Sequence, residues 1–91
     1  LMEAAEGYEQ IAKKLKPIDR LVFLALCADE NPFSQTLLAR IERDTAVKGI
    51  PANVQRALQR LTHANLISQI HKGEYYIEKP GLKHYLSTAS G

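Results

Sequence analysis

Hydrophobic residues recur at helical spacing through residues 51–63. Val54, Leu58 and Leu61 follow one another at intervals of three or four positions, which places them on one face of an α-helix. Pro51 suits the first turn of this helix, because its missing N–H would have no partner there and its φ is already helical. Asn65 marks the end of the helical pattern. The pattern therefore predicts an amphipathic helix that begins at Pro51 and ends before Asn65.

A short apolar pair and a second apolar run follow this helix at once. Leu66-Ile67 opens the first run and Tyr75-Tyr76-Ile77 forms the second, with Lys72-Gly73 between them. A Gly-containing turn between two short runs of this composition is typical of a β-hairpin. The chain is therefore predicted to pass from a helix directly into a two-stranded hairpin.

The rest of the chain is predicted to be helical, apart from turns. Residues 2–15 form an amphipathic pattern, Pro17 starts a second helix that runs to about Ala28, and Ser34 is a suitable N-cap for a third. Residues 48–50 are expected to close the third helix, and Pro80 to start a last helix over residues 80–88. Phe33 is expected to add a short strand. The order is helix, helix, strand stub, helix, helix, hairpin, helix.

This order predicts a mainly α fold with a small β-hairpin, namely a winged helix-turn-helix with flanking N- and C-terminal helices. Residues 1–91 are expected to form one domain, with the winged-helix core at 17–77 and flanking helices at 2–15 and 80–88. The expected core consists of Leu21, Val22, Ala25, Leu38, Ile41, Val54, Leu58, Leu61, Leu66 and Ile77.

The second helix is apolar on nearly all sides, so it must be covered from two directions. Phe23, Leu24 and Cys27 lie away from its first apolar stripe, and we expect residues 2–15 to cover them only in part. Large exposed apolar patches usually mark interfaces. These three residues are therefore the expected interface for a homodimer or for a preceding domain of the same chain.

Positive charge is concentrated in one part of the sequence. The net charge is +2, and residues 45–73 contain no Asp or Glu but four Lys and Arg. Those four are Lys48, Arg56, Arg60 and Lys72. In winged helices the third core helix, here 51–63, can enter the major groove of DNA. The expected DNA-binding residues are Lys48, Asn53, Arg56, Gln59, Arg60, His63 and Lys72.

Other kinds of chemistry are not indicated. The three histidines are scattered without metal-ligand spacing, no phosphate-binding loop is present, and no nucleophile is paired with a base. We therefore expect no catalytic residue, no metal and no cofactor in this segment. No apolar run approaches the ~20 residues that span a bilayer. The single cysteine, Cys27, suits a reducing compartment, so a soluble cytoplasmic domain is expected.

Several segments together resemble a known family. They are Leu15-Lys16-Pro17-Ile18-Asp19-Arg20, the stretch Val54–Leu61, Asn65-Leu66-Ile67, and Tyr75–Leu86. This series is similar to the C-terminal winged-helix domain of AAA-type ATPases with an archaeal-type or STAND-like ATP-binding module. Lys79 stands where the family pattern has an acid. The resemblance implies an ATPase domain before residue 1 and places no ATP-binding residue within these 91.

Two functions follow as alternatives. The first is a non-catalytic module that binds double-stranded DNA through the third core helix. The second is a protein-interaction or regulatory domain that docks on its own ATPase domain or on a partner, without nucleic acid. Winged helices serve both roles, so fold alone does not decide between them. The acid-free 51–63 segment favours DNA, whereas the low net charge and the apolar second helix favour docking.

Overall fold

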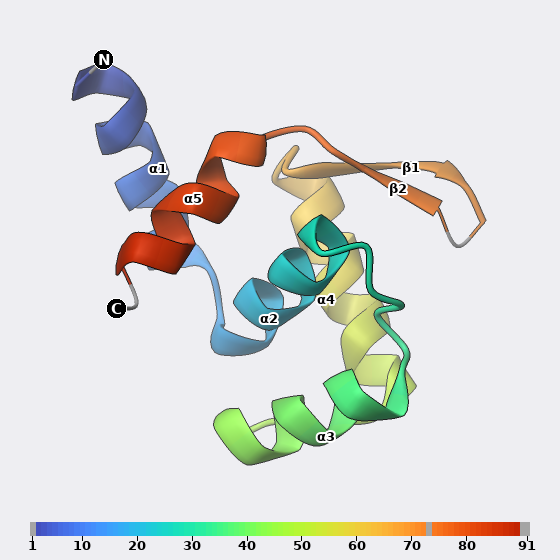
Figure 1. The fold of residues 1–91 in the computed structure, drawn as a ribbon. Helices are drawn as coiled ribbons and strands as arrows, with labels where there is room; N and C mark the ends of the chain where they lie inside the picture. Colours follow the sequence, from blue (N-terminus) through green and yellow to red (C-terminus); the bar gives the residue numbers. More distant parts are fainter. Residues whose placement is uncertain (1, 73, 90–91) are drawn as a thin grey trace.

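The computed structural model describes residues 2–72 and 74–89, with side chains for 8–72 and 74–86. Its elements are α1 (Met2–Lys14), α2 (Pro17–Cys27), α3 (Gln35–Asp44), α4 (Pro51–His63), β1 (Ile67–His71), β2 (Glu74–Ile77) and α5 (Pro80–Ala89). The predicted fold class is confirmed, because the chain is mainly helical with one small antiparallel hairpin. Figure 1 shows α2, α3 and α4 together, with the hairpin on one side and α1 and α5 on the other.

Local sequence signals account for the helix ends. Pro17 and Pro51 stand in the first turns of α2 and α4, and the Ser34 hydroxyl accepts a hydrogen bond from the Leu37 N–H at 3.2 Å. Asp29 and Asn65 have φ of 64° and 62°, directly after α2 and α4. In both places the next N–H returns to a carbonyl of the last helical turn, which is the Schellman arrangement. The end predicted at Asn65 is therefore confirmed.

The expected orientation of the core helices is confirmed for most of the core. Val22, Ala25, Ile41, Val54, Leu58, Leu61 and Leu66 are buried, whereas Leu21, Leu38 and Ile77 are only partly buried and pack against them. The buried set also includes residues absent from the expected core, namely Ala12, Ile18, Phe23, Leu37, Ala57, Ile67, Leu82 and Leu86. The core thus extends beyond the winged-helix segment into α1 and α5.

The expected interface on α2 requires a correction. Phe23 is fully buried, and Leu24 and Cys27 are partly buried against the core. The reason is that α2 is covered from several directions: it packs against α3, α4 and β2, and α5 also returns to lie on it. Leu82 and Leu86 of α5 are themselves buried. Phe23 is therefore not exposed for the expected interface, and Leu24 and Cys27 are exposed only in part.

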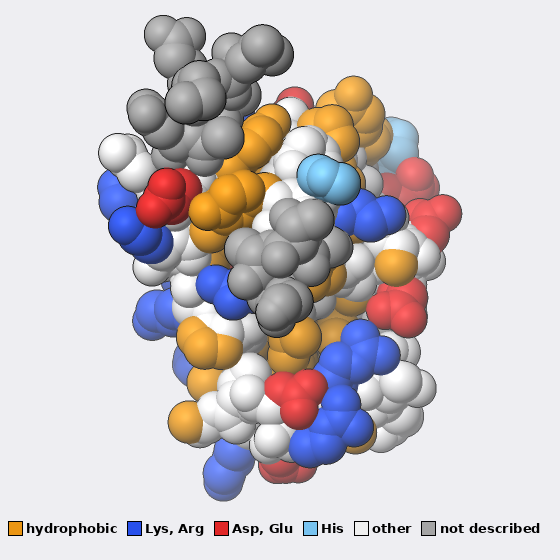
Figure 2. Space-filling view, turned by 60° about the vertical axis from the view of Figure 1, so that its left-hand side comes forward, with side chains coloured by type: hydrophobic (Ala, Val, Ile, Leu, Met, Phe, Trp, Pro, Cys, Tyr) orange, Lys and Arg blue, Asp and Glu red, His pale blue; other side chains and the backbone are white. Residues whose placement is uncertain are grey.

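The side of the molecule that carries α1 and α5 has a mixed surface. Figure 2 shows acidic, basic and hydrophobic side chains interspersed there, without a broad region of one charge. Tyr8 of α1 and Tyr85 of α5 lie with their ring centroids 6.5 Å apart, which ties the two flanking helices together. Among the described residues, none of the helices combines the length and the apolar content needed to cross a bilayer.

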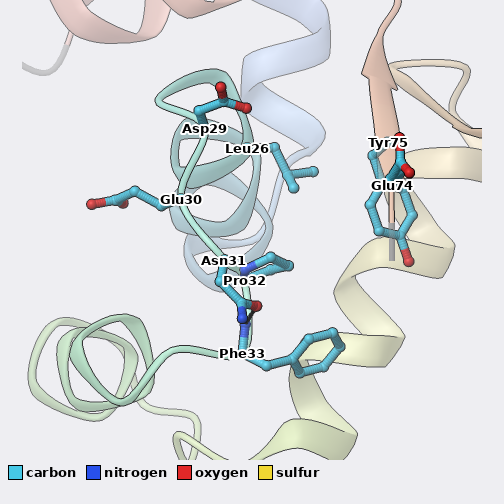
Figure 3. Close-up of a pocket in the computed structure, with 8 residues that line it drawn as sticks. All are labelled: Leu26, Asp29, Glu30, Asn31, Pro32, Phe33, Glu74 and Tyr75. Carbon is cyan, nitrogen blue, oxygen red and sulfur yellow. Dashed lines mark hydrogen bonds between the residues drawn. The ribbon is translucent and has the colours of Figure 1, made fainter. Parts of the chain in front are cut away.

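The hairpin pairs Ile67 with Ile77 and Ser68 with Tyr76, and its register shifts between Gln69 and His71. The strand expected at Phe33 is absent: among the described residues the sheet has two strands. The backbone turns back on itself at this point, because the Asn31 side chain accepts the Phe33 N–H at 2.9 Å and the Asn31 carbonyl accepts the Ser34 N–H. Pro32 also lacks the N–H that a paired strand needs. Figure 3 shows this loop facing β2 without joining it.

The connection between α3 and α4 differs from expectation, since α3 ends at Asp44 and residues 45–50 are not helical. The Thr45 hydroxyl donates to the Ile41 carbonyl at 2.7 Å and accepts the Val47 N–H at 3.0 Å. A β-carbon at Gly49 would lie 1.9 Å from the Leu38 carbonyl oxygen. Glycine therefore allows this connection to pass directly against α3.

Candidate nucleic-acid interface

One face of α4 is buried and the opposite face is exposed, as the sequence pattern predicts. The buried residues are Val54, Ala57, Leu58 and Leu61, and the exposed ones include Gln55, Arg56, Gln59 and His63. None of the exposed side chains on this helix is acidic. Arginine and glutamine side chains can donate and accept hydrogen bonds at base edges. The exposed face of α4 therefore has the chemistry that groove recognition requires.

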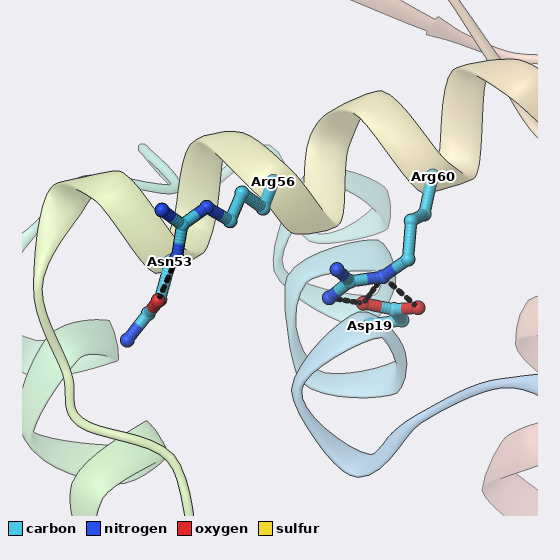
Figure 4. Close-up of polar contacts among 4 residues, drawn as sticks. All are labelled: Asp19, Asn53, Arg56 and Arg60. Atoms are coloured by element: carbon cyan, nitrogen blue, oxygen red, sulfur yellow. Dashed lines mark hydrogen bonds and ion pairs between the residues drawn. The ribbon is translucent and has the colours of Figure 1, made fainter.

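Arg60 is paired with Asp19 of α2, whose carboxylate is buried. Its Nε donates to both carboxylate oxygens, at 3.1 and 3.0 Å, and a terminal nitrogen donates to Oδ1 at 2.7 Å. The Asp19 side chain is 4% exposed and the Arg60 side chain is 38% exposed. This geometry is the bidentate pairing that makes Arg–carboxylate bonds strong. Figure 4 shows the Arg60 side chain directed at α2.

This pair corrects the expectation for Arg60. Three of its hydrogen bonds are used within the protein, and moving it to DNA would leave the buried Asp19 without a partner. Hydrogen bonding to Asp19 raises the pKa of Arg60 above its ordinary value. Asp19 also lies in the first turn of α2, where negative charge is favourable. Arg60 thus joins α4 to α2, and its Nε and one terminal nitrogen are already occupied by Asp19.

Asn53 has a similar local role. Its amide nitrogen donates to the Lys48 carbonyl at 2.9 Å, and its side-chain oxygen accepts from Arg56 at 3.3 Å. The first contact fastens the connection before α4 to the helix itself. The second contact lies on the exposed surface, so Arg56 can exchange it for a ligand (Figure 4). Of the two expected arginines, Arg56 is therefore the one available for groove contact.

The other residues expected to bind DNA do not all lie on α4. His63 is exposed at the end of α4, beside Gln59, while Lys48 is exposed before α4 and Lys72 is exposed after β1. A groove of about 240 Å³ separates α4 from the hairpin, and Gln55, Gln59, His63 and Gln69 line it. Gln55 and Gln69 were not predicted from sequence. Lys48 and Lys72 line neither this groove nor the surface around Arg60.

Two lysines that are distant from α4 in sequence, Lys14 and Lys16, lie next to its exposed surface in the folded protein. A depression of about 470 Å³ is lined by Arg56, Gln59, Arg60, His63 and Ala64. A second depression, of about 320 Å³, shares Arg60 and Ala64 with the first and is lined also by Lys14 and Lys16. The basic surface therefore continues from α4 to the α1–α2 junction. The only signal in the sequence is the Lys13-Lys14 and Lys16 cluster before Pro17, which does not reveal that it lies near α4.

Other reactive groups do not form a second site of this kind. No cluster of three or more His, Cys, Asp or Glu that could hold a metal occurs within residues 2–72 and 74–89. Burial raises the pKa of the Cys27 thiol, and Lys83 offsets this in part. The thiol is therefore mostly protonated at neutral pH, which makes it a poor nucleophile.

The chain was compared with models of protein families, with curated protein sequences and with solved structures, and nothing in the three comparisons matches it.

Proposed function

We propose that this domain is a non-catalytic module that binds double-stranded DNA with the exposed face of α4. The observation that carries the proposal is the surface formed by Arg56, Gln59 and His63, which contains no acid. A second depression, in which Asp19 is paired with Arg60, continues this surface to Lys14 and Lys16. In winged helices the corresponding helix lies in the major groove. The single cysteine suits a cytoplasmic location for this function.

The residues divide by the contacts they could make. Arg56 and Gln59 lie one turn apart on exposed positions and could reach base edges. Lys14 and Lys16 lie beyond the helix and could contact the phosphate backbone, which positions a protein without reading sequence. Arg60 contributes indirectly, because its pair with Asp19 holds α4 at a defined angle to α2. A rigid helix loses less entropy when it enters a groove.

The small number of charges limits the affinity. Each Lys or Arg that neutralises a phosphate releases counterions, so binding should weaken steeply as salt rises. With so few basic residues on this surface, we expect a dissociation constant of about 10⁻⁴–10⁻⁶ M at physiological salt.

The first test measures binding of the domain to a fluorescent random-sequence duplex of about 16 base pairs, by anisotropy at about 50 and 150 mM salt. Arg56→Ala should weaken binding, because a contact in the groove is lost. Lys14→Ala with Lys16→Ala should lower the slope by up to about two.

Control variants distinguish binding through the α4 surface from general electrostatic attraction between the basic protein and DNA. Arg43→Ala removes an exposed arginine that is paired with Asp44 on α3, and Lys79→Ala with Lys83→Ala removes two positive charges from the region of α5. These variants should bind almost as wild type does. If wild type fails to bind at the lower salt, or if the controls weaken binding as much, the proposal is refuted.

Protein docking is the second candidate, and two exposed hydrophobic side chains favour it. Ile70 is 55% exposed and Tyr76 is 58% exposed, both on the hairpin. Under this alternative the domain packs on an ATPase domain of its own chain or on a partner, and duplex DNA shows no salt-sensitive binding. The resemblance of Tyr75–Leu86 to the AAA-type ATPase pattern supports an ATPase parent chain as part of either proposal. A phosphate-binding loop in the parent sequence would test that part.

A further inference from the structure

The outer edge of β2 has no strand partner among the described residues, because the sheet contains only β1 and β2. The Glu78 N–H donates to the Leu66 carbonyl, and Ser68 lies opposite Tyr76. Antiparallel pairing alternates, so the backbone groups of Tyr76 face β1 and those of Tyr75 and Ile77 face the opposite edge. An unpaired edge of this kind is a template for another strand.

A cleft of about 600 Å³ lies along this part of the hairpin, between β2 and the loop that connects α2 to α3. Its apolar side chains are Leu26, Pro32, Phe33 and Tyr75, and its other lining residues are Asp29, Glu30, Asn31 and Glu74. The loop turns back at Asn31 and leaves the place of a third strand open (Figure 3). The volume is in the range of pockets that bind ligands.

The charged residues that line the cleft are all acidic. Asp29, Glu30 and Glu74 are all exposed, and no Lys or Arg is among the eight lining residues. Arg40 approaches Glu30 only at 3.9 Å, which is a weak surface pair. The cleft therefore combines apolar walls, a free strand edge and an acidic lining, in which the Glu30 side chain points away from β2 (Figure 3).

We propose that β2 binds an extended, basic segment of a partner protein, which adds a third strand to the sheet in this cleft. The main chain of the segment pairs with the free backbone groups of Tyr75 and Ile77. Alternate side chains point in opposite directions along a strand, so one set contacts Phe33 and Tyr75 while Lys or Arg residues of the segment meet the carboxylates. The site adjoins the groove between α4 and the hairpin, because Tyr75 lines both, but its other lining residues lie outside that groove. The proposal does not depend on DNA binding.

Charge complementarity selects this occupant over the two other candidates. A DNA phosphate chain would be repelled by the three carboxylates. A second copy of this domain, pairing β2 with β2 about a two-fold axis, would bring two acidic clefts together, and like charges opposite one another destabilise strand pairs. A basic extended peptide has neither disadvantage.

The test uses a fluorescein-labelled peptide that alternates Lys and Val over about six residues, the length of a typical strand. Its twin with Glu in place of Lys should bind at least about tenfold more weakly, because it repels the carboxylates. Two further twins carry N-methyl groups on all Val or on all Lys residues. Only one of these sets should abolish binding, because alternate N–H groups of an added strand face the protein.

Protein variants locate the site. Asp29→Asn with Glu74→Gln should weaken binding of the Lys/Val peptide about three- to tenfold at low salt. Glu9→Gln with Glu42→Gln removes the same charge from exposed positions outside the cleft and should change binding less than about twofold. The proposal is overturned if the Lys/Val peptide fails to bind, if both N-methylated twins bind equally, or if the two double variants behave alike. Self-association of the domain that the peptide does not compete away would also overturn it, in favour of a β2–β2 dimer.

Discussion

We predict that replacing Asp19 and replacing Arg60 will lower the stability of the domain by different amounts. The two residues are 41 positions apart in sequence and join α2 to α4 through three hydrogen bonds of 2.7–3.1 Å. Their burial is unequal, since the Asp19 side chain is 4% exposed and the Arg60 side chain is 38% exposed. Truncating one partner should therefore not cost the same as truncating the other.

Arg60→Ala leaves a buried carboxylate without its partner, and uncompensated buried charge is the expensive outcome of breaking such a pair. The cost reported for fully buried pairs is about 3–5 kcal/mol, and the position of Asp19 in the first turn of α2 offsets part of it, so we expect about 2–4 kcal/mol. Asp19→Asn leaves an arginine that can turn toward water, so we expect only about 1–2 kcal/mol. The larger figure is a substantial part of the ~5–10 kcal/mol expected for a domain of this size.

A double-mutant cycle with urea unfolding tests this asymmetry. The domain is unfolded by urea as wild type, as Asp19→Asn, as Arg60→Ala and as the double variant, with circular dichroism as the readout. The double variant should be more stable than Arg60→Ala alone, because the neutral amide removes the buried charge. Arg43→Ala, which breaks an exposed pair with Asp44, serves as the control and should leave the urea midpoint almost unchanged. If Arg60→Ala proves no more costly than Asp19→Asn, or if the double variant is no more stable than Arg60→Ala, the argument from unequal burial is wrong.

Two further predictions concern other positions. Gly49→Ala should destabilise the domain by at least about 2 kcal/mol in the same urea assay. The reason is that the added β-carbon would lie 1.9 Å from the Leu38 carbonyl oxygen, so the backbone would have to move. A change within about 0.5 kcal/mol of wild type would contradict this close approach. Burial raises the pKa of Cys27, so iodoacetamide should alkylate the folded protein more slowly than the urea-unfolded chain at about pH 8. The unfolded thiol ionises first, so the stability that the neutral thiol contributes is full below the ordinary pKa of a cysteine and is lost as pH rises through the raised pKa of Cys27. Equal alkylation rates in the two states would contradict this account.

Features that depend on neighbouring residues could be predicted from the sequence. Pro17 and Pro51 start helices, Ser34 caps one and Asn65 ends one, because the groups involved lie within one or two turns of each other. The burial of Val54, Leu58 and Leu61 also follows from local spacing, since a helix that buries one of them must bury the others. The same spacing placed Arg56, Gln59 and His63 on the exposed face.

Only the tertiary structure decided which of the expected site residues are engaged in contacts within the protein. Arg60 and Arg56 are one turn apart on the same helix, yet only Arg60 meets a buried carboxylate, which belongs to a helix 41 positions earlier. Lys14 and Lys16 adjoin α4 because the junction between α1 and α2 lies beside the last turn of α4. Phe23 is buried because α3, α4, α5 and β2 all pack against α2, and β2 keeps a free edge because the loop at Asn31 turns away from it. These outcomes depend on contacts between segments distant in sequence, and periodicity within one helix or strand carries no information about which distant segment will pack against it.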